Sequence, residues 1–208
     1  MTRPWVKICG ITNRDDAVEA IRLGADALGF NLWSGSKRYL PFEENADWIA
    51  GLPGQIERVA VVVNAPLSEA RRIAQHPAFH SIQFHGNEDP DYLAEFAQSG
   101  HPFTMALRLG ENRSLKIEGS SSHRLLIDAA VPGEFGGTGV MLDLDLAARF
   151  VQERPESKII LAGGLTPENV RMAIERVQPF GVDVASGVEK TPRQKDWEKL
   201  EAFISAAR

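Results

Sequence analysis

The heptapeptide Val6-Lys7-Ile8-Cys9-Gly10-Ile11-Thr12 has the pattern of a short apolar strand that ends in a glycine turn just before a helix. It contains the only cysteine of the chain. A free cysteine usually behaves as a small buried hydrophobe. A thiol at the end of a strand, two residues after a lysine, is also well placed for a chemical role. The heptapeptide alone leaves both interpretations open.

The same alternation of short apolar runs and amphipathic segments continues along the whole chain. Eight runs are predicted as strands, at residues 5–9, 27–31, 58–64, 81–85, 103–108, 125–128, 158–162 and 182–185. Between them, apolar residues recur at helical spacing, as in Ala17, Ala20, Ile21 and Gly24. Two helix starts are predicted from capping patterns, one at Thr12 with Asp15 and one at Thr166-Pro167-Glu168.

Eight strands, each followed by a helical segment, within 208 residues indicate a (βα)8 TIM barrel of the α/β class. No linker or low-complexity stretch interrupts the pattern, so we expect one domain over residues 1–208. The weakest predicted helix lies at residues 111–118. An open doubly wound sheet remains the alternative architecture.

Composition narrows the range of partners and locations. The formal net charge of −5 argues against nucleic acid or an anionic membrane as the main partner. One cysteine allows no internal disulfide, and no apolar run has the length of a signal peptide core or a membrane span. We therefore expect a cytoplasmic protein. The sequence shows no metal-ligand spacing, and we expect neither a metal nor a cofactor.

Polar side chains recur where the predicted strands end. In a closed barrel these ends meet at one face, which carries the active site, whereas buried parallel strands are otherwise almost wholly apolar. The residues at these ends are Cys9, Asn31, Asn64, Gln83, His85, Arg108, Asp128, Gly163, Gly164, Asp183 and Ser186. Their accumulation predicts a site at this face, although each one alone is also explained as a solvent-facing strand end.

The two-residue period of a strand adds a finer prediction. Lys7 and Cys9 lie two residues apart and so face the same side of their strand. Asp183 faces inward on the eighth strand, which neighbours the first in a closed barrel. We therefore predict a Lys7–Asp183 ion pair beneath the mouth. It would serve to neutralise two buried charges, or to favour the thiolate form of Cys9.

Glycine-rich turns late in the chain point to a phosphate site. They are Gly136-Gly137-Thr138-Gly139, Gly163-Gly164 and Ser186-Gly187, after the sixth, seventh and eighth predicted strands. In barrels of this kind the loops after strands seven and eight commonly bind phosphate. Glycine lets backbone N–H groups approach an anion closely. We expect a small phosphorylated substrate held by neutral donors, with Gly137, Gly163, Gly164, Ser186 and Gly187 in contact with it.

Taken in order, the motifs resemble those of the phosphoribosylanthranilate isomerase family, (βα)8 enzymes of tryptophan biosynthesis. The matching segments are 6–12 (VKICGIT), 24–30, 36–39 (SKRY), 63–64, 83–86 (QFHG), 126–128 (LID), 136–139, 162–169 (AGGLTPEN) and 182–189 (VDVASGVE). They cover nearly the whole chain. KICGIT followed by a distal GVDVxSGVE is a highly specific combination.

The resemblance implies an Amadori rearrangement of N-(5-phosphoribosyl)anthranilate to 1-(2-carboxyphenylamino)-1-deoxyribulose 5-phosphate. It assigns Asp128 as general acid and Cys9 as general base. Those roles require a raised pKa for Asp128, and for Cys9 a pKa below the usual value of about 8.5. Arg38 matches an arginine that engages the anthranilate carboxylate. Gln83 and His85 would orient substrate or support the wall.

Two departures from the family pattern stand out. Residues 140–144 read Val-Met-Leu-Asp-Leu and keep only the aspartate, Asp143, of the family's usual continuation after the glycine turn. Arg193 stands where the family favours glycine, which predicts a local change of turn.

Three functions stay open from the sequence: the isomerase, a related phosphosugar epimerase or isomerase on the same fold, and a non-catalytic phospholigand-binding descendant. The protein is expected to be a monomer or a homodimer.

Overall fold

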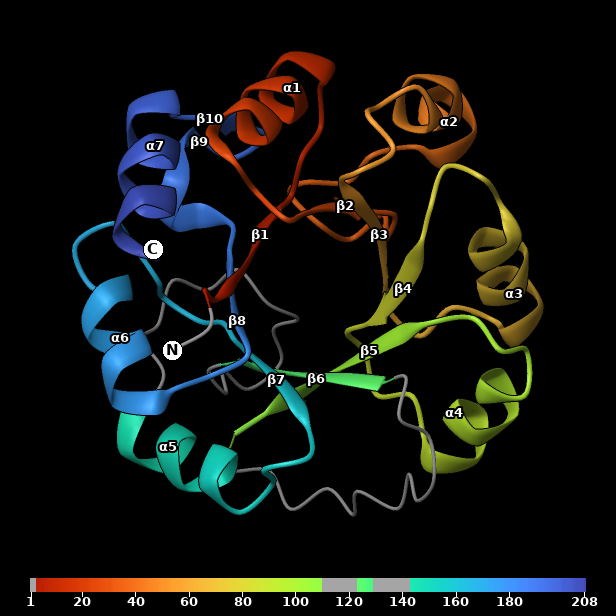
Figure 1. Ribbon diagram of the computed structural model, residues 1–208. Helices are drawn as coiled ribbons and strands as arrows, with labels where there is room; N and C mark the ends of the chain where they lie inside the picture. The colour runs from red at the N-terminus through yellow and green to blue at the C-terminus, as the bar shows by residue number, and fades with distance from the viewer. Residues whose placement is uncertain (1–2, 110–122, 129–142) are drawn as a thin grey trace.

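The computed structural model describes residues 3–109, 123–128 and 143–208. Eight parallel strands follow one another around a closed barrel, and pairing of the first with the last completes it (Figure 1). The strands are β1 (Trp5–Cys9), β2 (Ala27–Asn31), β3 (Glu57–Val62), β4 (Ser81–Phe84), β5 (Phe103–Arg108), β6 (His123–Asp128), β7 (Lys158–Leu161) and β8 (Gly181–Val184). The predicted TIM barrel is confirmed, and the open doubly wound sheet is excluded.

Helices form a ring outside the strands (Figure 1). They are α1 (Arg14–Leu23), α2 (Phe42–Ala50), α3 (Leu67–Gln75), α4 (Pro90–Ala97), α5 (Leu144–Gln152), α6 (Val170–Val177) and α7 (Trp197–Ala206). Within the described ranges, none of them is both long and apolar enough to cross a membrane. The helix expected at residues 111–118 lies outside the described residues.

Strand and helix boundaries differ from the predictions by a few residues. The third strand ends at Val62 rather than Asn64, because Asn64 adopts the left-handed φ of 50° at the start of a turn. The cap predicted at Thr12 is wrong: Asn13 is the N-cap of α1 and its side chain accepts from the Asp16 N–H. The Thr12 hydroxyl instead donates to the Arg193 carbonyl oxygen at 2.8 Å. α6 starts at Val170, later than the predicted Thr166 cap.

The apolar residues form two clusters that follow strand alternation. The larger one fills the space between barrel and helices, with Ile8, Phe30 and Phe84 fully buried in it. The smaller one fills part of the barrel interior with Ala106, Leu126, Ile160 and Ala162 and packs against Trp5. Burial on both faces explains why the strands read as nearly continuous apolar runs.

A polar cluster occupies the amino-terminal end of the barrel. The Glu57 carboxylate accepts hydrogen bonds from Arg124 at 2.7 Å and from the Ser81 hydroxyl at 2.8 Å. The Arg124 guanidinium lies 4.6 Å from the Trp5 ring centroid, within cation–π range. These contacts satisfy the charges at this end, so the functional cavity must be sought at the carboxyl ends of the strands.

A small hairpin follows the last barrel strand. The 3-10 turn η1 (Ser186–Val188) leads into β9 (Glu189–Thr191) and β10 (Gln194–Lys195), which pair antiparallel. Asp16 of α1 holds the hairpin by accepting from the Lys195 backbone N–H at 3.0 Å and from Trp197 Nε1 at 2.9 Å. At the hairpin turn Arg193 has φ 77°, in the region that favours glycine.

Gly29 of β2 is a packing constraint inside the barrel. A Cβ atom there would lie 2.8 Å from Cys9 Sγ and 3.0 Å from Lys7 Nζ. Gly29→Ala should therefore displace both side chains and lower the free energy of unfolding by about 1–3 kcal/mol, as overpacking does. Urea denaturation measures the change.

Gly54→Ala is the matched control. Apart from Gly54 and its two chain neighbours, no residue has an atom within 4 Å of a Cβ built on Gly54, so this variant should stay within about 0.5 kcal/mol of the parent. Equal stability of the two variants would show that the space beside Cys9 is not restrictive.

Candidate active site

One cavity opens at the carboxyl ends of the strands and collects most of the predicted site residues. Those that line it are Cys9, Asn31, Arg38, His85, Asp128, Gly163, Gly164, Asp183, Ser186 and Gly187. Gln83 lies behind His85 and is 1% exposed. Gly137 and the altered residues 140–142 lie outside the described residues. Asn64 does not line this cavity; its side chain accepts from the Asn87 N–H in a neighbouring loop.

The predicted ion pair beneath the mouth is confirmed. Lys7 and Asp183 are register partners on β1 and β8, and Lys7 Nζ donates to Asp183 Oδ1 at 2.9 Å. The Lys7 side chain is only 1% exposed. Burial alone would lower the pKa of Lys7, but the charges of Asp183 and Cys9 raise it to about 12. Lys7 therefore keeps its charge directly beside the thiol.

The expectation that the pKa of Cys9 lies below its ordinary value is wrong. Burial raises the pKa of the Cys9 thiol, and the Asp183 carboxylate adds to that effect. The ammonium groups of Lys7 and Lys195 oppose it without overcoming it. The two-residue period of the strand identifies the lysine beside the thiol. It does not show how strongly the surrounding protein desolvates the thiol, which is partly buried in the cavity wall.

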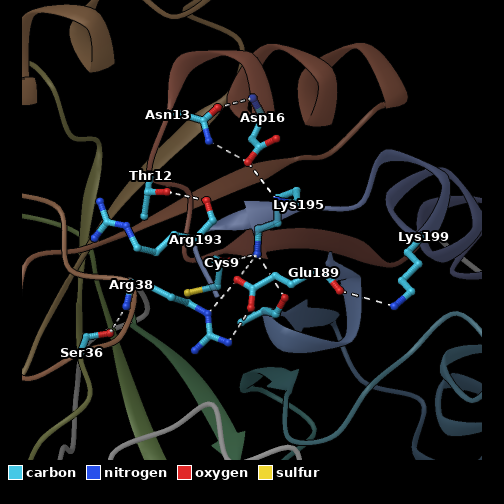
Figure 2. Close-up of polar contacts among 11 residues, drawn as sticks. Cys9, Thr12, Asn13, Asp16, Ser36, Arg38, Glu189, Arg193, Lys195 and Lys199 are labelled. Carbon is cyan, nitrogen blue, oxygen red and sulfur yellow. Dashed lines mark hydrogen bonds and ion pairs between the residues drawn. The ribbon is translucent and has the colours of Figure 1, made fainter. Parts of the chain in front are cut away.

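Arg38 is fixed in the wall of the cavity and is not a solvent-exposed loop cation. Its Nε and Nη2 atoms donate to the two oxygens of Glu189 at 2.8 and 2.7 Å (Figure 2). These hydrogen bonds raise the pKa of Arg38 against the effect of burial. Its aliphatic stem packs on Gly10, where a Cβ atom would lie 2.3 Å from Arg38 Cδ. The planar fork is thus held rigid at the mouth.

Glu189 and Lys195 are site residues that the sequence did not reveal. Glu189 Oε1 accepts from Lys195 Nζ at 3.1 Å as well as from Arg38, so one carboxylate joins two cations (Figure 2). Both residues belong to the hairpin, which returns to the mouth only through tertiary packing on α1. In the sequence, Glu189 is visible only as the last residue of the VDVASGVE segment, and that segment alone assigns it no partner.

A second polar chain supports Asp128 on β6. Gln83 Nε2 lies 2.9 Å from His85 Nδ1, and His85 Nε2 lies 3.6 Å from Asp128 Oδ2. With the Gln83 amide as donor, His85 carries its proton on Nε2 and directs it at the carboxylate. Gln83 therefore supports His85, and His85 faces the cavity beside Asp128.

The glycine turns after β7 and β8 face the same cavity. Gly163 and Gly164 have φ values of 85° and 64°, a conformation that favours glycine and that places successive backbone N–H groups in a concave loop. A Cβ atom on Gly187 would lie 1.9 Å from the Leu165 carbonyl oxygen, so the two loops are packed against each other. Such a surface can bind an anion through neutral donors.

The cavity thus combines a thiol, a carboxyl group, a rigid guanidinium and a glycine-lined anion surface. In the described ranges, no group of three or more His, Cys, Asp or Glu side chains is arranged to hold a metal ion. The arrangement is suited to moving protons on an anionic substrate.

The chain is similar to known proteins over nearly its whole length. Residues 6–206 match the family model of N-(5'-phosphoribosyl)anthranilate isomerase. Isomerases of that name from Rubrobacter xylanophilus and Geobacter metallireducens are 41% and 40% identical, each over 98% of both chains.

Solved structures show the same similarity. A phosphoribosylanthranilate isomerase from Thermotoga maritima superposes with a TM-score of 0.85 at 34% identity, over 98% of both chains. A phosphoribosylanthranilate isomerase bound to reduced 1-(o-carboxyphenylamino)-1-deoxyribulose 5-phosphate gives 0.82 at 33%, again over 98% of both. A further structure shows monomers generated from the dimeric Thermotoga maritima isomerase, with a TM-score of 0.83 at 33% identity over 98% of both chains.

The Lys7–Asp183 pair should make the free energy of unfolding fall as the pH rises in the alkaline range. The pKa of Lys7 is about 12 in the folded protein against an ordinary 10.5. Because the folded protein binds this proton more tightly than the unfolded chain, protonated Lys7 contributes about 2 kcal/mol to the free energy of unfolding. The contribution is complete below pH 10.5 and is lost as the pH rises through 12. Urea unfolding at a series of alkaline pH values measures it.

The double variant Lys7→Met/Asp183→Asn should lack this part of the alkaline loss. Tyr92, whose pKa is also raised to about 12, titrates in the same range and is common to both proteins, so the difference between them reports the Lys7–Asp183 pair and its coupling to Cys9. Lys7→Met alone should cost about 3–5 kcal/mol because it leaves Asp183 buried without its partner. Matching alkaline curves for parent and double variant would contradict the assignment.

Proposed function

The chain belongs to the N-(5'-phosphoribosyl)anthranilate isomerase family, and from this membership we propose that it converts N-(5-phosphoribosyl)anthranilate to 1-(2-carboxyphenylamino)-1-deoxyribulose 5-phosphate in tryptophan biosynthesis. The observation that carries the residue assignments is that Cys9 and Asp128 line one cavity, at the ends of β1 and β6. Only β7 and β8 separate these two strands around the barrel. A substrate held there can meet a base and an acid at the same time.

Asp128 is the general acid of the first step. Its proton passes to the furanose ring oxygen, the bond between that oxygen and C1 breaks, and the electron pair of the anilino nitrogen forms a C1=N iminium. His85, which lies 3.6 Å from Asp128 Oδ2, keeps the carboxyl group oriented toward the cavity. Asp128 is 8% exposed, so little water competes for its proton.

Cys9 is the general base of the second step. Its thiolate takes the proton from C2, the C–H electrons form a C1=C2 double bond, and the iminium nitrogen regains its electron pair. The resulting enolamine tautomerises to the ketone by gaining a proton at C1 and losing one from the C2 hydroxyl. The Lys7 ammonium beside the thiol favours the thiolate that this step requires.

The two anionic ends of the substrate have separate binding groups. Gly163, Gly164, Ser186 and Gly187 offer backbone N–H groups to the phosphate. Arg38, fixed by Glu189, offers its remaining N–H groups to the anthranilate carboxylate. Asp183 acts from beneath, through Lys7. A cytoplasmic location and a monomeric or homodimeric state stay predictions.

Replacing either proton-transfer group should abolish most of the activity. Cys9→Ser and Asp128→Asn should each lower kcat by about 10²-fold or more, the contribution of one positioned proton transfer. Turnover is followed by loss of phosphoribosylanthranilate fluorescence, with the labile substrate generated in situ.

Asp89→Asn is the matched control for Asp128→Asn. Asp89 caps α4, and asparagine serves equally well at an N-cap, so both fold and activity should persist. Full turnover in Cys9→Ser would show that the thiol is a packing residue. Binding of reduced product by the parent without any turnover would favour a non-catalytic phospholigand-binding protein.

Arg38 should contribute selectively to recognition of the carboxylate. Arg38→Lys keeps the charge but not the fork, so affinity for reduced 1-(o-carboxyphenylamino)-1-deoxyribulose 5-phosphate should fall by about tenfold. Affinity for ribose 5-phosphate, which lacks the anthranilate group, should stay within about twofold. Calorimetric titration measures both, with the neighbouring exposed Lys37→Met as control. Equal losses for the two ligands would place Arg38 at the phosphate instead.

A further inference from the structure

Lys195 is a buried lysine at the mouth of the barrel that the proposed mechanism does not use. Its side chain is 0% exposed. Its Nζ atom donates to the Cys9 carbonyl oxygen at 2.7 Å and to the Ala185 carbonyl oxygen at 3.1 Å, and it pairs with Glu189 Oε1 at 3.1 Å (Figure 2). The amine thus contacts the strand that carries Cys9, the residue after β8, and the carboxylate that holds Arg38.

The number of these contacts indicates the charge of the amine. A protonated lysine has three N–H groups and a neutral one has two. Three acceptors surround Lys195 Nζ, and one of them is a carboxylate. Burial lowers the pKa of Lys195 and Glu189 opposes the change. The three acceptors hold the amine as an ammonium.

The charged groups around Cys9 do not balance while the thiol is protonated. Lys7 and Asp183 form one pair on β1 and β8. Arg38 from the loop after β2 and Lys195 from β10 share the single carboxylate of Glu189 on β9. In these side-chain ion pairs three cations therefore face two anions, and a thiolate at Cys9 makes the set neutral. The nearby Asp16 carboxylate accepts from the Lys195 backbone N–H and the Trp197 indole and pairs with none of these three cations. On the far side of the cavity His85 Nε2 lies 3.6 Å from Asp128 Oδ2, so these two side chains contact each other rather than the cations beside Cys9.

We propose that Lys195 is a positioning residue that supplies the excess positive charge balanced by the Cys9 thiolate, while its ion pair with Glu189 holds Arg38 in place. This inference rests on the proposed function, in which Cys9 is the base. It adds a residue outside the barrel strands to the control of that base. A purely structural lysine would stabilise the hairpin without changing the ionisation of the thiol.

The test measures the thiol directly. Cys9 is the only cysteine of the chain, so the rate of alkylation by uncharged iodoacetamide as a function of pH reports its ionisation alone. Lys195→Met removes the charge and keeps the length of the side chain. Lys195→Gln removes the charge and keeps a hydrogen-bond donor. Since a nearby opposite charge changes an ionisation equilibrium by about tenfold or more, both variants should react about tenfold more slowly at neutral pH and reach the parent rate at alkaline pH.

Lys199→Met is the matched control. Lys199 Nζ contacts Glu189 through its backbone oxygen at 3.4 Å, so this variant loses a lysine from the same cluster but not a charge beside Cys9 (Figure 2). Its alkylation profile should equal that of the parent. The kcat/KM profile of Lys195→Gln should move toward alkaline pH together with its alkylation profile.

An unchanged alkylation profile in folded Lys195→Gln would overturn the inference, whatever its turnover. Failure of both Lys195 variants to fold, judged by circular dichroism, would also overturn it in favour of a structural role. Failure of the proposed function is recognised separately, because Cys9→Ser would then retain turnover while the alkylation profiles still differ.

Discussion

The constraint on which this structure depends is the burial of paired charges inside the barrel. Lys7 and Asp183 face each other across the strand pair that closes the barrel, so ring closure and charge neutralisation occur at the same place. A buried charge without its partner costs several kcal/mol. A shift of one residue between β1 and β8 would turn these side chains toward opposite faces. The ion pair therefore favours the register that also brings Cys9 to the mouth.

A second group of paired charges, formed by Arg38, Glu189 and Lys195, lies partly outside the barrel strands. Glu189 and Lys195 come from the hairpin after β8, yet they determine where Arg38 lies, 151 residues from Glu189 in sequence. Asp16 anchors that hairpin through the Lys195 backbone and the Trp197 indole. The carboxyl-terminal segment is consequently part of the mouth, and α7, beginning at Trp197, secures it from outside. Packing of α7 on α1 thus helps to position the Arg38 guanidinium through the hairpin.

Local sequence patterns predict the features that follow from strand periodicity. They do not predict contacts between segments that are far apart in the sequence. Eight apolar runs were enough for the barrel, and two-residue spacing was enough for the Lys7–Asp183 pair. The N-cap assignment failed because Thr12 and Asn13 are both good caps, and a tertiary contact with Arg193 engages the threonine. Glu189 and Lys195 were missed since no local pattern shows that a hairpin folds back over the first strand. The sequence shows that Arg193 stands where the family favours glycine. It does not show that Arg193 adopts the left-handed conformation typical of glycine, with a φ of 77°.

The raised pKa of Cys9 shows that neighbouring charges alone do not predict the ionisation of a buried thiol. Lysine beside a thiol suggests a low pKa, but burial outweighs the cations and raises it. For a general base this opposition is useful, because a thiolate whose conjugate acid has a higher pKa accepts a proton more strongly, while too high a value leaves little thiolate at working pH. Burial and the surrounding cations shift the same pKa in opposite directions, and that one pKa determines both the strength of the base and the fraction that is ionised. In the proposed reaction, the optimum between the two depends on both Lys7 inside the barrel and Lys195 outside it.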